Sequence, residues 1–224
     1  KENIENDLIL TSGENVTIAL LSAILKKRNI RSIPLLGWQI PIITDQNYQK
    51  AKILNIDKKR IKNFFDNYDV LVLAGFQGVN ILGNITSLGR GGSDTTAVAI
   101  ASAVNAERCD IYTDVEGVYT TDPKLVPKAK KIDKISYEEM LEMASLGSKV
   151  MQPHSIQDSR LNRIDIEVRS SFKNVSGSLI TKKKNISSNN IIRGVSFTKN
   201  DAKVTLVGVK DRPGVAAAIF EPFF

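Results

Sequence analysis

The stretch LGRGGSDTTAVAIASAVNA, residues 88–106, decides the fold and carries the clearest chemical signal. It joins a loop with paired glycines, Gly91 and Gly92, to a run of small residues that is typical of a packed helix. Because glycine has no Cβ, the backbone of such a loop can approach a ligand closely. The first turn of the helix adds free N–H groups and the positive end of the helix dipole. We therefore predict an anion-binding site where the loop meets the helix.

Two charged residues argue that this loop is more than a turn. Arg90 offers a planar cationic fork that suits a carboxylate or a phosphate. Asp94 places a carboxylate inside a positive site, where a purely structural loop would not need one. The alternative is a strand-to-helix turn capped by a serine or aspartate side chain. We favour the ligand site because glycines, arginine and aspartate together open one helix.

Composition indicates a globular protein of one or two domains. The chain has 224 residues, of which 42% are hydrophobic and 25% charged, as is ordinary for soluble proteins. We see no apolar run near the ~20 residues that span a bilayer, and KENIENDLIL does not look like a signal peptide. We therefore expect no membrane partner. The single cysteine, Cys109, excludes an internal disulfide and fits the cytoplasm; we expect it to be a buried, inert thiol in a strand.

The net charge of +7 raises the question of nucleic acid. Its lysines and arginines are scattered, however, and the aromatic residues, 6% of the chain, do not interleave with them. We therefore expect no nucleic-acid partner, whereas anionic small substrates would suit the charge. The single histidine, His154, has no cysteine or histidine close by in the sequence, so we expect no zinc site and name no metal ligand.

Helix and strand patterns alternate along the chain, which predicts an α/β fold with a parallel sheet. We expect helices over residues 16–29 (with Ser12 as N-cap), 58–67 (capped by Asp57), 93–106, 136–146 (opened by a capping box) and 153–162. We expect strands over residues 31–36, 51–56, 69–74, 108–113 and 164–170.

A polar segment divides the chain. We assign residues 1–183 to the main domain, 184–190 to a linker and 191–224 to the start of a second, small α+β domain. In that second part we expect strands over 191–198 and 203–209, then a turn at Asp211, Arg212, Pro213 and Gly214 that leads into a helix. Both ends of the chain give the impression of a fragment.

Several kinds of chemistry are disfavoured by what the sequence lacks. It has no G-x-x-x-x-G-K-[ST] loop, no G-x-G-x-x-G after a strand, and only one histidine for a Ser-His-Asp set. The glycine loops, the strand that ends at Thr113-Asp114, and Lys149 in a helix break fit phosphoryl transfer better. That reaction needs positioning and cations more than covalent participation by the protein. Lys149 could supply a cation, and Asp94 could hold it.

Each candidate also has a simpler interpretation. Glu14 could merely favour a helix N-terminus, and Asp114 could cap a turn. Lys149 could be a solvated surface lysine, and Tyr119 could be a packing residue. The segment that begins at Asp211 could be only a turn and a helix start.

Several longer motifs occur in the order of a known family. They are Ser12-Gly13-Glu14, Gly75-Phe76-Gln77-Gly78, Leu88–Thr96, Tyr112–Pro123, Glu138-Glu139-Met140 with Gly147-Ser148-Lys149-Val150, and Val168–Phe172. With these motifs the chain resembles the aspartate kinases of the amino acid kinase family. The resemblance implies a three-layer αβα fold with a parallel-rich sheet, followed by the start of a ferredoxin-like ACT domain. It also implies ATP-dependent phosphorylation of the β-carboxylate of L-aspartate, which opens the route to lysine, threonine, methionine and diaminopimelate.

The resemblance assigns roles to residues of this sequence. Glu14 would hold the amino group of aspartate, and Arg90 its carboxylates, with Gly91, Gly92 and Ser93 alongside. Asp94 would organise the catalytic lysines, of which Lys149 is present. Residues lining the ATP site would be Thr113, Asp114, Tyr119, Lys124, Ser148 and Lys149.

The resemblance also implies partners. Mg²⁺ would accompany ATP and would be held mainly by its phosphates. Lysine or threonine would bind as an inhibitor at Asp211, Arg212, Pro213 and Gly214, and ACT domains would pair chains into homo- or hetero-oligomers.

One departure from the family matters. The family's Lys-Phe-Gly-Gly-Thr/Ser motif, which supplies another catalytic lysine, is absent from this sequence. We therefore expect these 224 residues alone to be inactive or nearly so. The alternative function is a non-catalytic regulatory subunit that binds an amino acid, and a weaker one, from charge alone, is nucleic-acid binding.

Overall fold

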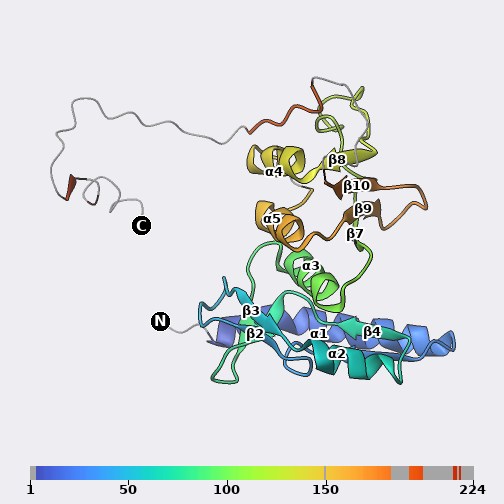
Figure 1. The fold of residues 1–224 in the computed structure, drawn as a ribbon, viewed down its shortest axis with the longest axis vertical. Coiled ribbons are helices and arrows are strands. Elements are labelled where there is room, and N and C mark those ends of the chain that lie inside the picture. The colour runs from blue at the N-terminus through green and yellow to red at the C-terminus, as the bar shows by residue number, and fades with distance from the viewer. Residues whose placement is uncertain (1–3, 149, 183–191, 199–213, 216, 218–224) are drawn as a thin grey trace.

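The computed structural model describes residues 4–148, 150–182, 192–198, 214, 215 and 217, and Figure 1 shows their arrangement. The helices are α1 (Ile4–Lys27), α2 (Lys58–Phe65), α3 (Gly92–Val104), α4 (Tyr137–Ser145) and α5 (Pro153–Asn162). The strands are β1 (Ser32–Leu35), β2 (Ile42–Thr44), β3 (Ile53–Ile56), β4 (Val70–Leu73), β5 (Gln77–Val79), β6 (Ile85–Ser87), β7 (Cys109–Thr113), β8 (Lys134–Ser136), β9 (Ile166–Ser170) and β10 (Ser178–Thr181).

The strands form mixed sheets in which parallel pairing predominates. One sheet pairs β1 with β4, a second has the order β3-β2-β5-β6, and a third has the order β7-β9-β10-β8. The ladders β1–β4, β2–β5, β7–β9 and β8–β10 are parallel, whereas β2–β3, β5–β6 and β9–β10 are antiparallel. The α/β architecture expected from the sequence is confirmed, with the difference that the strands are divided among three sheets instead of one.

Helix α3 joins two bodies of the molecule. In Figure 1 it lies between α1, α2 and β2–β4 on one side and α4, α5 and β7–β10 on the other. Its buried residues contribute to both cores: Ala103 packs with the cluster around Leu35 and Ile42, and Val98 with the cluster around Ile166. The stretch that opened the sequence analysis is therefore the structural link between the two bodies.

Several local predictions are confirmed. The Asp57 side chain accepts a hydrogen bond from Arg60 N at 2.9 Å and caps α2. Ser136 and Glu139 form the reciprocal capping box at the start of α4. Cys109 is buried in β7, and burial, with nearby carboxylates, raises the pKa of its thiol to about 11. A thiol with that pKa is an inert packing group at neutral pH, as expected.

The prediction for the first helix is wrong at its start. Ser12 lies inside α1, where its hydroxyl donates to the carbonyl of Ile9 at 2.7 Å instead of capping an N-terminus. Glu14 is also in the middle of α1. The simpler interpretation, that it merely favours a helix N-terminus, is therefore wrong. Packing keeps the helix continuous: Asp7 and Ile18 are both buried on the core side, which outweighs the ~1 kcal/mol that a mid-helix glycine costs.

Helix α1 also corrects the statement that no apolar segment approaches the length that spans a bilayer. Within the described residues, it is long and apolar enough to cross a membrane by length and composition alone, with a mean hydropathy of 1.7. In this fold α1 packs along β1, β4 and β6, and 17% of its apolar window is buried. Its other side exposes apolar side chains, among them Leu8, Ile9, Val16 and Leu20.

The second domain proposed from the sequence lies largely outside the described residues. The linker 184–190, the strand 203–209 and Asp211, Arg212 and Pro213 cannot be compared with the structure for this reason. Gly214 is in a turn with φ +89°, and Val215 and Ala217 are helical. The strand expected over 191–198 is wrong where it can be compared, because residues 192–198 run without strand pairing and attach to the main domain instead.

Candidate active site

The two glycine loops of the sequence meet in space. Phe76 N donates to Thr96 Oγ1 at 3.1 Å, and Leu88 N donates to the carbonyl of Phe76 at 3.0 Å. Gly75 lies against Ser93, where a Cβ on Gly75 would be 3.4 Å from the Ser93 hydroxyl. The loop after β4 and the loop that opens α3 are therefore one structural unit.

Gly91 is the N-cap of α3 and the tightest point of this unit. Its φ of +72° lies in the left-handed region, and α3 begins without a side-chain cap. The alternative of a turn capped by Ser93 or Asp94 is therefore wrong: both residues lie in the first helical turn. A Cβ on Gly91 would overlap Gln152 Cγ and lie 2.9 Å from Gln152 Cβ. The loop can adopt this shape only with glycine here.

The start of α5 packs beside the start of α3. Thr95 Oγ1 and Ser155 Oγ are 3.1 Å apart and hydrogen bonded. Asp94 is partly buried, and this burial raises the pKa of its carboxyl group, while the positive charge of His154 acts in the opposite direction. His154 therefore belongs to the surroundings of Asp94, a role that the sequence analysis did not assign to it. Lys149, the expected partner of Asp94, is outside the described residues.

Two further residues predicted to bind the substrate are an arginine and a glutamate. Arg90 is exposed at the mouth of the loop, and it makes no ion pair with any residue in the described ranges. Glu14 is partly buried on α1. Its neighbour Asn15 accepts a hydrogen bond from Gln77 Nε2 at 2.8 Å. That bond brings α1 alongside the 75–78 loop, so the elements that carry Glu14 and Arg90 converge on the same unit.

A buried carboxylate on α1 fixes the approach to the Arg90 loop. Asp7 is fully buried and accepts hydrogen bonds from Ser87 N at 2.9 Å, Ser87 Oγ at 2.8 Å and Gln49 N at 3.1 Å. A Cβ on Gly89 would lie 2.9 Å from the carbonyl oxygen of Gln49. Asp7 therefore holds Ser87, which precedes the turn before Arg90, and Gln49, which packs against Gly89 in that turn. Nothing in the sequence pattern singled it out.

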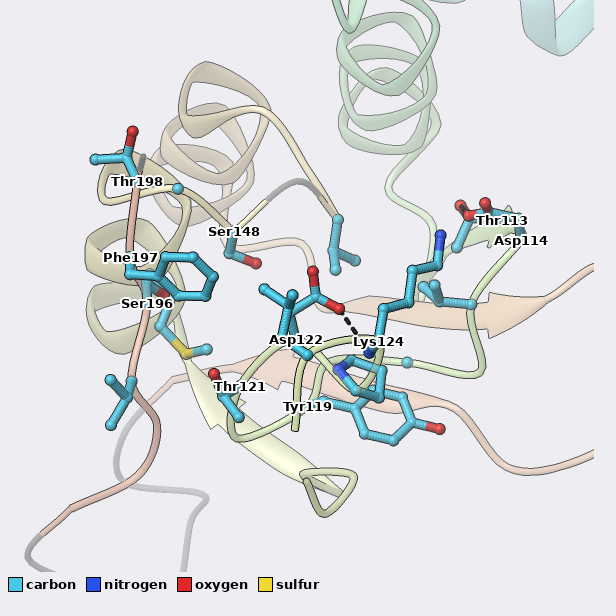
Figure 2. Close-up of a pocket in the computed structure, with 18 residues that line it drawn as sticks. Thr113, Asp114, Tyr119, Thr121, Asp122, Lys124, Ser148, Ser196, Phe197 and Thr198 are labelled. Carbon is cyan, nitrogen blue, oxygen red and sulfur yellow. Dashed lines mark hydrogen bonds between the residues drawn. The ribbon is translucent and has the colours of Figure 1, made fainter. Parts of the chain in front are cut away.

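A cavity of about 610 Å³ lies at the carboxyl end of β7. Open α/β sheets bind ligands outside the carboxyl ends of their strands. Every described residue predicted for the nucleotide site lines this cavity, namely Thr113, Asp114, Tyr119, Lys124 and Ser148. Figure 2 shows them around one space. The loop that carries them is braced locally, since Lys124 N donates to Asp122 Oδ1 at 2.9 Å.

The cavity is also lined by residues to which the sequence analysis assigned no role. They are Val115, Gly117, Thr121, Asp122, Pro123, Leu125, Met143, Gly147, Val150 and the segment Val195–Thr198. Those between 115 and 123, together with Gly147 and Val150, belong to motifs quoted from the sequence, so these motifs were the available signal for them. The segment 195–198 follows a polar stretch, and no pattern in the sequence indicated that it returns to this site.

Residues 147–152 connect the two places directly. Gly147 and Ser148 line the cavity, whereas Gln152 packs under Gly91 at the start of α3. The intervening backbone spans only a few residues, each of which extends the chain by at most ~3.6 Å. The cavity and the loop of residues 88–93, which we call the anion loop, are therefore adjacent parts of one site.

The site is suited to a phosphorylated ligand. The cavity combines an ammonium group, hydroxyls and carboxylates with apolar surface from Met143, Leu125 and Phe197. Such a mixture fits a nucleotide, which has an apolar base and an anionic tail. Across the part of the chain that the structure describes, no cluster of three or more His, Cys, Asp or Glu side chains could hold a metal ion.

Comparison with known proteins shows the family of the chain. Residues 1–170 match the model of the Amino acid kinase family. The chain is 50% identical over 219 residues to an aspartate kinase of Pseudomonas putida, and 45% identical over 216 residues to an aspartokinase of Geobacillus stearothermophilus. These alignments cover 97% and 96% of this chain but 53% of each relative. The chain thus spans about half the length of the curated relatives it matches.

Solved structures give the same result for the fold. Aspartokinase III of E. coli, in complex with aspartate and ADP, is 32% identical with a TM-score of 0.75, over 85% of this chain and 43% of that one. A UMP kinase of Bacillus anthracis, 19% identical, has a TM-score of 0.59 over 81% of this chain and 71% of that one, which shows a shared fold alone.

Proposed function

The chain belongs to the amino acid kinase family, and on that premise we propose that it carries much of the active site of an aspartate kinase. The reaction is transfer of the γ-phosphoryl group of ATP to the β-carboxylate of L-aspartate, giving 4-phospho-L-aspartate and ADP. The observation that carries the proposal is the adjacency of the anion loop and the cavity through residues 147–152. The aspartate kinases among its relatives support the choice of acceptor.

The chemistry asks little of the protein beyond positioning and charge. An oxygen of the β-carboxylate attacks the γ-phosphorus, the bond to the β,γ-bridging oxygen breaks, and ADP leaves. The attacking carboxylate is already ionised, so no general base is required. Two anions must nevertheless be brought together, which demands cations and aligned N–H groups around them.

We assign the acceptor side to the anion loop. Arg90 would pair with carboxylates of aspartate, and Glu14 would hold its amino group. The amides of Gly91, Gly92 and Ser93 lie at the N-terminus of α3, at the positive end of the helix dipole. The Gly92 amide already donates to the carbonyl of Gly89 at 3.0 Å, so Gly92 would contribute by letting the backbone approach the ligand closely. Arg90 is exposed and without an ion-pair partner among the described residues, as a ligand-binding arginine should be.

We assign the organising role to Asp94. Its carboxylate is partly buried in the first turn of α3. A buried carboxylate is stable when a cation pairs with it. Asp94 would therefore hold Lys149 in position, and Lys149 would offset charge on the transferred phosphoryl group.

We assign the cavity to ATP. Thr113, Asp114, Tyr119, Lys124 and Ser148 would surround the nucleotide, and Lys149 would lie at its phosphates. Mg²⁺ would travel with ATP, held mainly by phosphate oxygens. When bound, it would neutralise phosphate charge and orient the triphosphate.

The remaining proposals concern the wider protein. We propose that residues 191–224 begin an ACT domain, that Asp211, Arg212, Pro213 and Gly214 contact an inhibitory lysine or threonine, and that ACT domains pair chains. The complex of E. coli aspartokinase III with lysine and aspartate, 32% identical with a TM-score of 0.69, supports an amino-acid effector. The enzyme would work in the cytoplasm, at the entry to lysine, threonine and methionine synthesis.

A coupled assay of the full-length protein tests the activity. ADP release should require L-aspartate and should be lost with Asp94→Asn. Release that is independent of aspartate would contradict the acceptor, and no release at all would contradict the enzyme. Glutamate and UMP serve as control acceptors, because they distinguish this reaction from those of other kinases with the same fold.

A further inference from the structure

A short segment beyond the family-matched region forms part of the nucleotide cavity. The family model matches residues 1–170, yet Val195, Ser196, Phe197 and Thr198 line the cavity opposite Thr113 and Asp114. Figure 2 shows this segment at one side of the space, with the Phe197 ring directed into it. We refer to residues 194–198 as the strap.

The strap is attached to the main domain at successive points. Val195 N donates to the carbonyl of Thr120 at 2.7 Å. A Cβ on Gly194 would be 3.0 Å from that same carbonyl oxygen and 3.1 Å from Met143 Sδ. Just before the strap, Arg193 Nε is 3.4 Å from Glu139 Oε1. Backbone bonding, close packing and an ion pair therefore fix the segment against α4 and the 115–125 loop.

Gly147 makes the last of these contacts. A Cβ at this position would overlap the carbonyl oxygen of Phe197 and lie 3.0 Å from its carbonyl carbon. The backbone of the strap thus rests on the residue that precedes Ser148 and Lys149. Only a residue without a side chain allows this approach.

The strap presents a polar atom that lacks a partner. Ser196 Oγ is buried and has no hydrogen-bond partner among the residues that the structure describes. A buried hydroxyl without a partner destabilises the structure because it has lost its hydrogen bonds to water. A ligand group that fills the cavity and hydrogen bonds to this hydroxyl would remove that penalty. This hydroxyl belongs to a residue that lines the nucleotide cavity.

The charge distribution decides which part of a nucleotide would meet the strap. The charged residues of the lining are Lys124 and Asp114, on the side away from the strap, and Asp122, between that side and the strap, whereas Val195–Thr198 carry no charge. Val150 leads on toward Gln152 and the anion loop, where phosphoryl transfer must occur. The triphosphate therefore belongs to the charged side and the base to the strap.

We propose that the strap completes the nucleotide site, with the Phe197 ring packed against the base and Ser196 Oγ hydrogen bonded to the base or ribose. This inference rests on the proposed function, since it takes ATP as the occupant of the cavity. It makes nucleotide affinity depend on residues that lie outside the matched family region. Specificity for the base then comes partly from the segment that leads into the C-terminal part of the chain.

Calorimetric titration of the full-length protein with ADP and with tripolyphosphate tests the strap. Phe197→Ala should weaken ADP binding about tenfold, the order of an aromatic–base contact, and Ser196→Ala severalfold. Tripolyphosphate has no base, so its affinity should not change in either variant. The KM for aspartate should also stay constant. Phe65→Ala, which removes a half-exposed phenylalanine of α2, is the matched control and should leave ADP binding unchanged.

The outcomes separate this inference from the proposed function. Failure of the unmodified protein to bind ADP would overturn the proposed function. Normal ADP binding by the unmodified protein and by both strap variants would overturn the strap alone. Equal losses for ADP and tripolyphosphate would also overturn it, because the strap would then face the phosphates. Should Phe197→Ala not fold, Phe197→Leu and Ser196→Ala carry the same comparison with smaller changes in volume.

Discussion

The acceptor side and the nucleotide side of the proposed site are built in opposite ways. The anion loop is held by close contacts. Gly91 packs against Gln152, Phe76 is hydrogen bonded to Thr96 and Leu88, and the Asp7 carboxyl group accepts a hydrogen bond from Ser87 N. The nucleotide cavity is a space of about 610 Å³ whose walls come from separate segments, including a strap from beyond residue 190.

This difference follows from what each side must hold. A small acceptor must be placed to a fraction of an ångström for in-line transfer, so its loop gains from rigidity. A nucleotide has many atoms over which contacts can be distributed, so its site can be assembled from several elements. A single substitution in the anion loop should therefore cause a large loss of activity, whereas one in the cavity should cause a small one.

The largest effect is expected at Gly91. Gly91→Ala puts a Cβ into Gln152 at a φ of +72°, so the loop must move or the two helix ends must separate. We expect activity to fall at least 100-fold, since small displacements of a positioning loop cost about that much. Steady-state kinetics of the full-length protein would measure it.

A matched control separates backbone strain from displacement. Gly83→Ala has a similar φ of +81° but meets nothing within 4 Å. It should cost on the order of 1 kcal/mol of stability and leave kcat unchanged. Equal loss of activity in both variants would show that the loop is not the rigid side of the site.

The next effect is expected at Asp94. Asp94→Asn keeps the size of the side chain but removes the charge proposed to hold Lys149. We expect kcat to fall about 100-fold with little change in the KM for ATP. Asp158→Asn is the control, because this carboxyl is also partly buried near His154 and burial also raises its pKa. A change confined to KM would remove Asp94 from the catalytic step.

A smaller effect on activity is expected at Asp7, the buried residue hydrogen bonded to Ser87 before the loop. Asp7→Ala leaves the amides of Ser87 and Gln49 and the Ser87 hydroxyl without their acceptor. Each lost partner costs about 1–3 kcal/mol, so thermal unfolding should shift to clearly lower temperature. If the residue also positions Arg90, the KM for aspartate should rise while the Kd for ADP stays constant. Equal changes in both would indicate a general loss of folding.

The sequence predicted local structure better than it predicted tertiary contacts. Local chemistry was readable: Asp57 and Ser136 cap their helices as expected, and α5 runs over the predicted residues. The strands β2, β5, β6 and β8 were missed because three residues are too few to show a period. Ser12 was misassigned because its capping preference was outweighed by packing along α1.

The candidate site was predicted to the extent that it is encoded in contiguous motifs. The loop 88–96 and the stretch 112–123 each carry several of their site residues in one run. Gln152, Asp7 and the strap reach the site only through tertiary folding, and none has a spacing that could indicate it. His154 was weighed as a metal ligand, although its place in the structure is beside Asp94.

The smallest effect is expected from that histidine. Burial raises the pKa of Asp94, and the His154 cation lowers it. If the ionised form of Asp94 holds Lys149, activity falls as pH drops through the pKa of Asp94. His154→Gln removes the cation, so the acid limb of the kcat profile should move to higher pH, whereas His154→Arg should restore it. No shift, or a shift that persists with Asp94→Asn, would contradict the coupling.

The measurement that tests the central claim most directly is chemical trapping of the product. The full-length protein, supplied with ATP, Mg²⁺ and L-aspartate in the presence of hydroxylamine, should form the β-hydroxamate of aspartate in step with ADP. Gly91→Ala should abolish both products together. ADP formed without hydroxamate, or a hydroxamate at the α-carboxylate, would contradict transfer of the phosphoryl group from the cavity to an acceptor held by the anion loop.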